Sequence, residues 1–305
     1  MPQDGLLVID KPPGLTSHDV VQRIRKALGT RRVGHGGTLD PDATGVLLVA
    51  SGQATRFFPF LSKEDKDYEG RIRLGFATDT RDASGRPLTE ECPERPDRDA
   101  VLSAMKEFEG EILQTPPRFS AKKIGGRPVY KLARAEQDFE LKPVRVRIAR
   151  FDLRAYAPPY VDFEVACSAG TYIRSLAHDL GQRLGCGAHL AALRRTSVGC
   201  YGLDQSVTLE AFETAAAQGE ADRFIRPLES LLPWAPIFTV RPEAEAFVRN
   251  GRSIGPCELA VPYPGFDEPM AAEAGVVRLM SSAGKLLGLA RPAADRSLHP
   301  FLVLP

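Results

Sequence analysis

The sequence lacks several features that would assign it to common classes of protein. It has no run of roughly 18 apolar residues, the length that a membrane-spanning helix requires. Its N-terminus, Met-Pro-Gln-Asp-Gly, lacks the basic and then apolar segments of a signal peptide. The five cysteines are odd in number and include no Cys-x-x-Cys pair, which argues against a disulfide framework and against a zinc site. We therefore expect a cytoplasmic protein with reduced thiols, no bound metal and no membrane association.

The chain also lacks a phosphate-binding glycine loop, although Gly34–Gly45 is rich in glycine. Leu39 stands where a dinucleotide-binding motif requires its third glycine, and no Gly-Lys-Ser/Thr follows. The segment instead carries a carboxylate, Asp40, among small residues that let a large polar substrate lie against the backbone. Pro41 disfavours a helical conformation for Asp40, so the carboxylate is predicted to project from a turn. Taken alone, the segment fits an ordinary capped turn leading into a strand better than a reactive loop.

A large net charge is missing too, since the formal value is +1, but the cations are unevenly distributed. Residues 118–150 contain ten Lys or Arg against three acids. A second basic stretch, residues 23–32, contains five cations and no acid, and it leads directly into the glycine-rich loop. Two cationic segments near a reactive loop favour a polyanionic partner such as a nucleic acid. Either segment alone also fits a solvated charged face.

The pattern of apolar residues predicts a mixture of strands and helices. Strands are expected at 5–10, 46–50, 67–76, 144–157, 160–168 and 194–203, and helices at 17–28, 53–61, 97–109 and 170–184, with two weaker helices between 209 and 232. Ser17 is the predicted N-terminal cap of its helix, and Gly29 ends that helix. After Pro233 the sequence changes to short strands and turns, a pattern typical of a small β-barrel of about 70 residues.

Six separated segments together resemble one family. They are Asp10–Gly14, Gly34–Gly45, Asp65–Tyr68 with Thr78–Thr80, Phe119–Lys122, Cys167–Arg174 and Cys186–Arg195. In this order they resemble the TruB family, the bacterial tRNA pseudouridine-55 synthases, and the resemblance covers essentially the whole chain. Any one of these motifs would be weak evidence, but six in family order make coincidence very improbable.

The resemblance implies an α+β architecture, the pseudouridine-synthase fold, with a mixed and mainly antiparallel sheet flanked by helices. It implies a catalytic domain over residues 1–234, with a basic RNA-binding thumb insertion over about 114–143. Residues 235–305 would form a PUA-like β-barrel that binds RNA and contacts the acceptor end of tRNA. The length of 305 residues is consistent with about two domains.

The resemblance implies that the chain isomerises uridine in the T-arm loop of tRNA to pseudouridine after flipping the base out of its stack. Nothing is added or removed, so neither a cofactor nor a metal is expected. Asp40 matches the catalytic aspartate of the family and would act as nucleophile or as base. Asp42 is a rival carboxylate, but the family usually has an apolar residue at that position, so we favour Asp40.

Further residues take roles from the same resemblance. Arg174 would pair with Asp40 and keep it ionised. Tyr68 would pack on the flipped uracil, although a half-buried core position explains it as well. His35 would occupy the space that the base vacates, and it fits an ordinary turn residue too.

The remaining candidate residues line the pocket or bind RNA. Tyr172 would line the pocket, and since residues two apart on a helix do not share a face, we expect 169–174 to be extended or turning. Leu193 would form an apolar wall or simply pack in the core, and Lys11 would support the loop or bind substrate. The expected contacts of the thumb with the RNA backbone are Lys122, Arg127 and Lys131.

Four residues depart from the family pattern, namely Gly36, Asp42, Phe119 and Lys123. None of them is the proposed acid, arginine or stacking tyrosine. We expect a monomer without an obligatory protein partner. Two alternatives remain open: a tRNA-binding folding chaperone with secondary catalysis, and a dyskerin-like synthase directed by a guide RNA.

Overall fold

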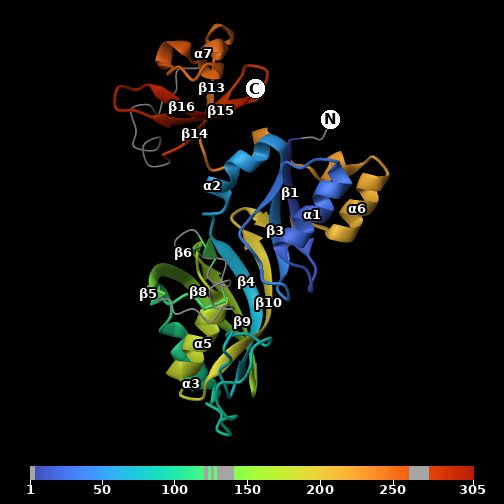
Figure 1. Cartoon of the computed structure of the whole chain (residues 1–305). Coiled ribbons are helices and arrows are strands. Elements are labelled where there is room, and N and C mark those ends of the chain that lie inside the picture. The colour runs from blue at the N-terminus through green and yellow to red at the C-terminus, as the bar shows by residue number, and fades with distance from the viewer. Residues whose placement is uncertain (1–3, 120–122, 125–126, 129–140, 261–274) are drawn as a thin grey trace. The chain divides into compact units, whose positions relative to one another are not determined.

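A computed structural model describes residues 4–119, 123–124, 127–128, 141–260 and 275–305 of the chain (Figure 1). Contacts within the chain divide it into two compact units. One unit comprises Val8–Val49 and Pro59–Phe224, and the other comprises Met1–Leu7, Ala50–Phe58 and Ile225–Pro305. The predicted domain division between residues 234 and 235 stays a prediction.

The described elements include both strands and helices, and those described between residues 110 and 167 are all strands. The strands are β1 (Gly5–Lys11), β2 (Val33–Gly36), β3 (Thr44–Ser51), β4 (Lys66–Leu74), β5 (Gly110–Gln114), β6 (Lys123–Ile124), β7 (Arg127–Pro128), β8 (Val144–Ala157), β9 (Tyr160–Cys167), β10 (Ala188–Val198), β11 (Tyr201–Gly202), β12 (Val207–Thr208), β13 (Ile237–Thr239), β14 (Val277–Met280), β15 (Leu286–Pro292) and β16 (Leu298–Val303). The α-helices are α1 (Ser17–Leu28), α2 (Phe58–Leu61), α3 (Arg98–Lys106), α5 (Ile173–Arg183), α6 (Leu209–Ala217) and α7 (Glu245–Arg249).

A ten-stranded sheet organises the larger unit. Its main path runs β12-β1-β3-β10-β4-β9-β8-β5, with β11 paired to β10 and β2 paired to β3. The β1–β12 and β3–β10 pairs are parallel, whereas β4 runs antiparallel to both β10 and β9, and β8 runs antiparallel to β9 and β5. The predicted mixed, mainly antiparallel sheet is therefore confirmed. Because β10 lies between β3 and β4, Arg195 is the register partner of both Gly45 and Tyr68.

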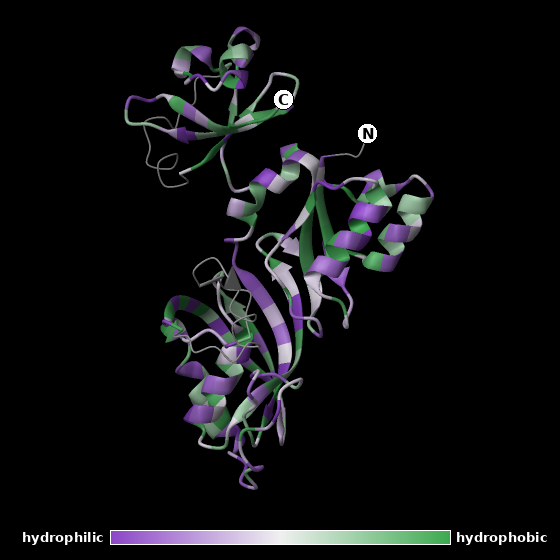
Figure 2. Ribbon diagram, in the orientation of Figure 1, coloured by the Kyte–Doolittle hydropathy of each residue, from purple (hydrophilic) through white to green (hydrophobic). Residues whose placement is uncertain are grey.

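The central strands β3 and β4 differ in how many of their residues are buried. Every residue of β3 after Thr44 is buried, and Figure 2 shows that β1 and β3 are apolar along most of their length. In β4, buried and exposed positions alternate, as expected for a strand with one face toward the core. Helix α1 packs on α6, while α3 and α5 pack on β8 and β10 respectively and contact each other (Figure 1).

Helix α1 begins one residue earlier than its predicted cap implied. Thr16, not Ser17, is the N-cap, and its side chain and that of Asp19 form a reciprocal capping box. Gly29 ends the helix in a left-handed conformation with φ of 62°. Ser17 is instead buried in the first turn, where its hydroxyl is available for another contact.

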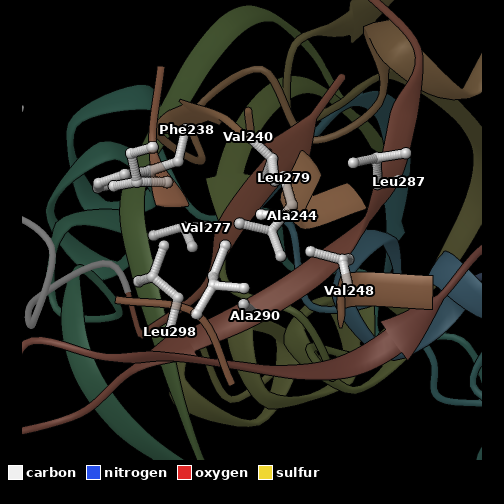
Figure 3. Packing of buried hydrophobic residues seen from close by; sticks show 11 residues of the cluster. Phe238, Val240, Ala244, Val248, Val277, Leu279, Leu287, Ala290 and Leu298 are labelled. Carbon is white, nitrogen blue, oxygen red and sulfur yellow. The ribbon is translucent and has the colours of Figure 1, made fainter. Parts of the chain in front are cut away.

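The C-terminal residues form a separate four-stranded sheet in the order β13-β14-β15-β16, with only the first pair parallel. Its apolar core includes Phe238, Val248, Leu279 and Leu287, with α7 contributing Val248 (Figure 3). The predicted closed barrel is not confirmed, because the strands at 237–303 that the structure describes form an open sheet order. A PUA-like identity for this unit stays a prediction.

In the described part of the chain, no helix has the length and apolar character needed to span a bilayer. Only short pieces of the predicted thumb insertion are described. Strands β6 and β7 pair in an antiparallel hairpin, in which Ile124 lies opposite Arg127. Lys122 and Lys131 lie outside the described residues.

Candidate active site

The loop between β2 and β3 presents Asp40 and is anchored on both sides of it. Before Asp40, the buried Ser17 hydroxyl accepts a hydrogen bond from the Leu39 N–H at 2.9 Å and donates to the Leu39 carbonyl at 3.1 Å. After Asp40, the Pro41 carbonyl accepts hydrogen bonds from Lys11 Nζ at 2.8 Å and from the Gly14 N–H. The carboxylate therefore projects from a turn that is held on one side by α1 and on the other by Lys11, at the end of β1, and by Gly14.

The ammonium group of Lys11 supports this loop by bonding backbone carbonyls, and Lys11 does not line the cavity. The side chain is fully buried, and Nζ also donates to the carbonyls of Pro12 at 2.8 Å and Leu15 at 2.6 Å. All three N–H bonds are thus directed at backbone oxygens. Burial lowers the pKa of Lys11 to about 8, while the nearby carboxylates of Asp42 and Asp40 act in the opposite direction.

A guanidinium holds the Asp40 carboxylate from two directions. Arg174 Nε lies 2.9 Å from Asp40 Oδ2, and Nη2 donates to Oδ1 at 3.1 Å. The arginine side chain is 8% exposed, whereas that of Asp40 is 43% exposed and so remains reachable from the cavity. Burial raises the pKa of Asp40, and the charge of Arg174 opposes that rise. The pair fixes the carboxylate in one orientation.

The same guanidinium holds a second carboxylate that our sequence analysis missed. Arg174 Nη1 lies 3.2 Å from Asp82 Oδ2 and donates to the Thr80 carbonyl at 3.2 Å. Nη2 also donates to the Phe119 carbonyl at 2.8 Å. Asp82 Oδ1 in turn accepts the Thr80 hydroxyl at 2.7 Å. Asp40, Arg174 and Asp82 form one connected network, which joins the turn at 78–85 to the loop that carries Asp40.

A cavity of about 310 Å³ opens beside Asp40. Its lining residues are Gly37, Thr38, Leu39, Asp40, Ser62, Lys66, Tyr68, Gly170, Thr171, Tyr172, Ile173, Arg174, Leu193 and Arg195. Tyr68, on β4, is 7% exposed, and burial raises the pKa of its phenol. The structure thus brings Asp40, Arg174, Tyr68, Tyr172 and Leu193 to one cavity, while their functional roles stay predictions.

Tyr172 lies at the junction between an extended segment and α5. It is the N-cap residue, with φ of −101° and ψ of 107°, so the prediction of a non-helical conformation is confirmed there. For Arg174 that prediction is wrong, because α5 begins at Ile173. The side chain of Gln114 holds the junction, since its Oε1 accepts the Tyr172 N–H at 2.7 Å and its Nε2 donates to the Tyr172 carbonyl at 3.1 Å.

Other predicted site residues lie elsewhere or remain untested. His35 belongs to β2 and is not among the residues that line this cavity, and its buried Nδ1 has no hydrogen-bond partner among the described residues. Arg127 lies in β7, and its side chain is outside what the structure describes. Of the residues that the sequence analysis missed, Lys66 and Arg195 were present in the quoted motifs, whereas Asp82 and Gln114 gave no local signal.

Comparison with known proteins finds matches over most of the chain. Residues 25–173 match the family model described as TruB family pseudouridylate synthase (N terminal domain), and residues 174–233 match the tRNA pseudouridylate synthase B C-terminal domain. A tRNA pseudouridine synthase B of Solibacter usitatus is 40% identical over 301 residues, which cover 99% of this chain and all of the relative. A protein of the same name from Opitutus terrae is 46% identical over 231 residues, which cover 75% of this chain and 95% of the relative.

Two solved structures have the same fold over most of the chain. An H/ACA RNP bound to a substrate RNA containing 2′-deoxyuridine matches with a TM-score of 0.73 and 27% identity, covering 99% of this chain and 85% of the matched chain. A Cbf5-Nop10-Gar1 complex matches with a TM-score of 0.71 and 30% identity, covering 94% of this chain and 78% of the matched chain.

Proposed function

The chain belongs to the TruB family of pseudouridylate synthases, and we propose that it isomerises the uridine at position 55, in the T-arm loop of tRNA, to pseudouridine. Relatives named tRNA pseudouridine synthase B that match almost the whole chain support tRNA as the substrate. We propose further that it acts in the cytoplasm as a monomer.

The observation that carries this proposal is the contact of both Asp40 carboxylate oxygens with Arg174 beside the cavity. The reaction breaks the bond between ribose C1′ and uracil N1, forms a bond between C1′ and C5, and moves one hydrogen from C5 to N1. Asp40 would act as nucleophile at the ribose or as base, and either role needs the carboxylate form. Arg174 bonds both carboxylate oxygens, so it favours that form and keeps it aimed at the cavity.

The cavity accounts for how the base would be held. A stacked uridine must leave its neighbours before reaction, at a cost of a few kcal/mol, and stacking on an aromatic side chain returns about 1 to 3 kcal/mol. Tyr68 and Leu193, on adjacent strands β4 and β10, line the cavity and would contact the flipped uracil. We assign His35 to the space the base vacates and Tyr172 to the pocket wall.

The remaining RNA contacts follow from charge. We propose that Lys122, Arg127 and Lys131 bind the RNA backbone, since phosphate contacts position an RNA without reading its sequence. Residues 235–305 would contact the acceptor end of tRNA as a PUA-like module. These assignments predict that charge-neutral variants of the three cations weaken tRNA binding and reduce its salt dependence.

Release of tritium from tRNA labelled at uracil C5 tests the proposed reaction. Wild-type protein should release the label, and Asp40→Asn should bind tRNA without releasing it. Asp162→Asn is a suitable control, because it removes a carboxylate that pairs with Arg71 in an exposed ion pair outside the cavity. A wild-type protein that binds tRNA and never releases tritium would exclude the proposed function.

A synthase directed by a guide RNA is the second candidate, because the solved neighbours include an H/ACA RNP and a Cbf5-Nop10-Gar1 complex. A T-arm hairpin without other RNA or protein, used as substrate, distinguishes the stand-alone synthase from the guide-directed one. If the chain acts alone, the purified protein converts the hairpin without added RNA or protein. A guided enzyme would leave the hairpin unmodified until a guide RNA is supplied.

A further inference from the structure

Two buried cations line the cavity beside Tyr68, and the proposed acid–arginine network uses neither. Arg195 is 1% exposed, and its guanidinium donates from Nε to the Val46 carbonyl at 2.7 Å and from Nη2 to the Gly37 carbonyl at 3.0 Å. These carbonyls lie on either side of Asp40 in the chain. One guanidinium therefore spans the loop and is held rigidly in the wall of the cavity.

Lys66 lies next to Arg195. It is 7% exposed, and its Nζ donates to the Ser62 carbonyl at 3.2 Å and to the Glu64 carbonyl. A Cβ placed on Gly37 would lie 3.4 Å from Arg195 Nη1 and 3.6 Å from Lys66 Cε, so both side chains flank the same glycine. Burial, followed by the charge of Arg195, lowers the pKa of Lys66 to about 8, and the ammonium is therefore charged at neutral pH.

In the part of the chain that the structure describes, these two cations differ from Arg174 in having no acidic ion-pair partner. Among the residues that the structure describes, no carboxylate oxygen lies within 4.0 Å of a side-chain nitrogen of Lys66 or Arg195. Two adjacent buried positive charges repel each other, and no carboxylate of the described residues lies close enough to either of them to offset that cost. Because both are fixed by backbone carbonyls, they are prepared for a negative charge that the substrate brings or develops.

The proposed isomerisation develops such a charge on the base. When the C1′–N1 bond breaks, its electron pair leaves with N1, and the detached uracil carries one negative charge spread over N1, O2 and O4. That charge disappears when a ring electron pair forms the C5–C1′ bond and the C5 proton moves to N1. It exists only between the two bonds, so groups that stabilise it lower the barrier to cleavage without strengthening ground-state binding.

We propose that Lys66 and Arg195 stabilise the negative charge on the uracil after it has detached from the ribose. This inference rests on the proposed function, because it concerns a step of that reaction. It predicts that the two cations affect the chemical step and leave the affinity for tRNA nearly unchanged. It also predicts that a base able to stabilise its own negative charge depends on them less.

The test compares two T-arm hairpins, one with uridine and one with 5-fluorouridine at the target position, in single-turnover reactions. Fluorine withdraws electrons from the ring and stabilises the uracil anion by itself. For Lys66→Met, loss of the parent nucleoside from the uridine hairpin should slow by about 10²- to 10³-fold. For the 5-fluorouridine hairpin the slowing should be smaller by about tenfold or more, because less stabilisation is needed. Lys66→Arg, which keeps the charge, should recover most of the rate.

Thermal unfolding and hairpin binding are measured for each variant, and Lys66→Gln replaces Lys66→Met if the latter does not fold. Arg278→Lys is the matched control, because Arg278 is equally buried and bonds the carbonyls of Ala235 and Glu229 outside the cavity. An equal loss on both hairpins, or an equal loss in Lys66→Arg and Lys66→Met, would show a purely structural role and overturn the inference. Inactivity of the wild type would instead count against the proposed function.

Discussion

The Ser17 hydroxyl bonds both backbone groups of Leu39, the residue immediately before Asp40. Ser17 and Leu39 are 1% and 3% exposed, so water cannot replace these bonds. Through these bonds the first turn of α1 fixes Leu39, the residue before Asp40. Lys11 fixes Pro41, the residue after it. The position of Asp40 therefore depends on contacts from residues more than 20 positions earlier in the chain.

Replacing Ser17 with alanine should reduce catalysis more than tRNA binding. The change leaves the Leu39 N–H and carbonyl buried without their partner, at a cost of about 1 to 3 kcal/mol in stability. Slight displacement of Asp40 should lower kcat by about tenfold to a hundredfold. Thr16→Ala is the control, since loss of the cap costs about 0.5 to 2 kcal/mol without touching the loop. Equal losses of kcat in the two variants, measured by tritium release, would refute a positioning role for Ser17.

The pair Thr16 and Ser17 also shows where sequence patterns are sufficient and where they are not. Both residues have hydroxyls that favour a helix start, so the local pattern predicts the helix and its Gly29 end to within one residue. The Ser17 hydroxyl bonds the backbone of Leu39, so the cap is formed by Thr16 instead. No local sequence pattern contains this contact between Ser17 and Leu39. The identity of the cap follows from the tertiary structure.

Asp82 should contribute to catalysis through its contact with Arg174. In Asp82→Asn the guanidinium loses one of its two carboxylates, so its hold on Asp40 loosens, and kcat should fall by about tenfold to a hundredfold. Affinity for tRNA should change little, because Asp82 contacts Arg174 and is not among the residues that line the cavity. Asp162→Asn removes an exposed partner of Arg71 and should leave kcat unchanged. Wild-type kcat in Asp82→Asn would exclude a role for this network.

The contacts among Asp40, Arg174 and Asp82 also show which parts of the site could be predicted from the sequence. Asp40, Arg174 and Tyr68 were predicted because they lie in recognisable motifs. Asp82 lies in an ordinary turn, and only the folded chain brings it within 3.2 Å of Arg174. Arg195 becomes a residue of the cavity only because β10 inserts between β3 and β4, and strand order is not encoded in local periodicity. The C-terminal strands were predicted as a group, but their closure into a barrel was not confirmed.

Asp42, a departure from the family pattern, should shift the pH dependence of activity. Burial is the main cause that raises the pKa of Asp40, and the charges of Asp82 and then Asp42 raise it further. Burial lowers the pKa of Lys11, and the charge of Asp42 opposes that effect. Removing the charge therefore lowers both pKa values. In Asp42→Leu the acid limb of the kcat profile should move to lower pH, because Asp40 ionises more readily. Asp42→Asn should show the same shift, which a change in side-chain size would not produce, and an acid limb that does not move would contradict this coupling.

Lys11 should make stability rise with pH in an alkaline window. Its pKa is about 8 in the folded protein, below the ordinary lysine value of 10.5, so between these values the unfolded chain binds more protons than the folded one. Stability must then increase as pH rises through this window, by up to about 3 kcal/mol at roughly 1.4 kcal/mol per pKa unit. Denaturant unfolding of the wild type and of Lys11→Met at several pH values measures the effect, because the difference between the two curves isolates this lysine from Lys66. Lys106→Met should keep the wild-type rise, since the pKa of that exposed lysine is raised by Glu109 rather than lowered. A difference curve that is flat from pH 8 to 10.5 would mean that Lys11 holds the Pro41 carbonyl without a lowered pKa.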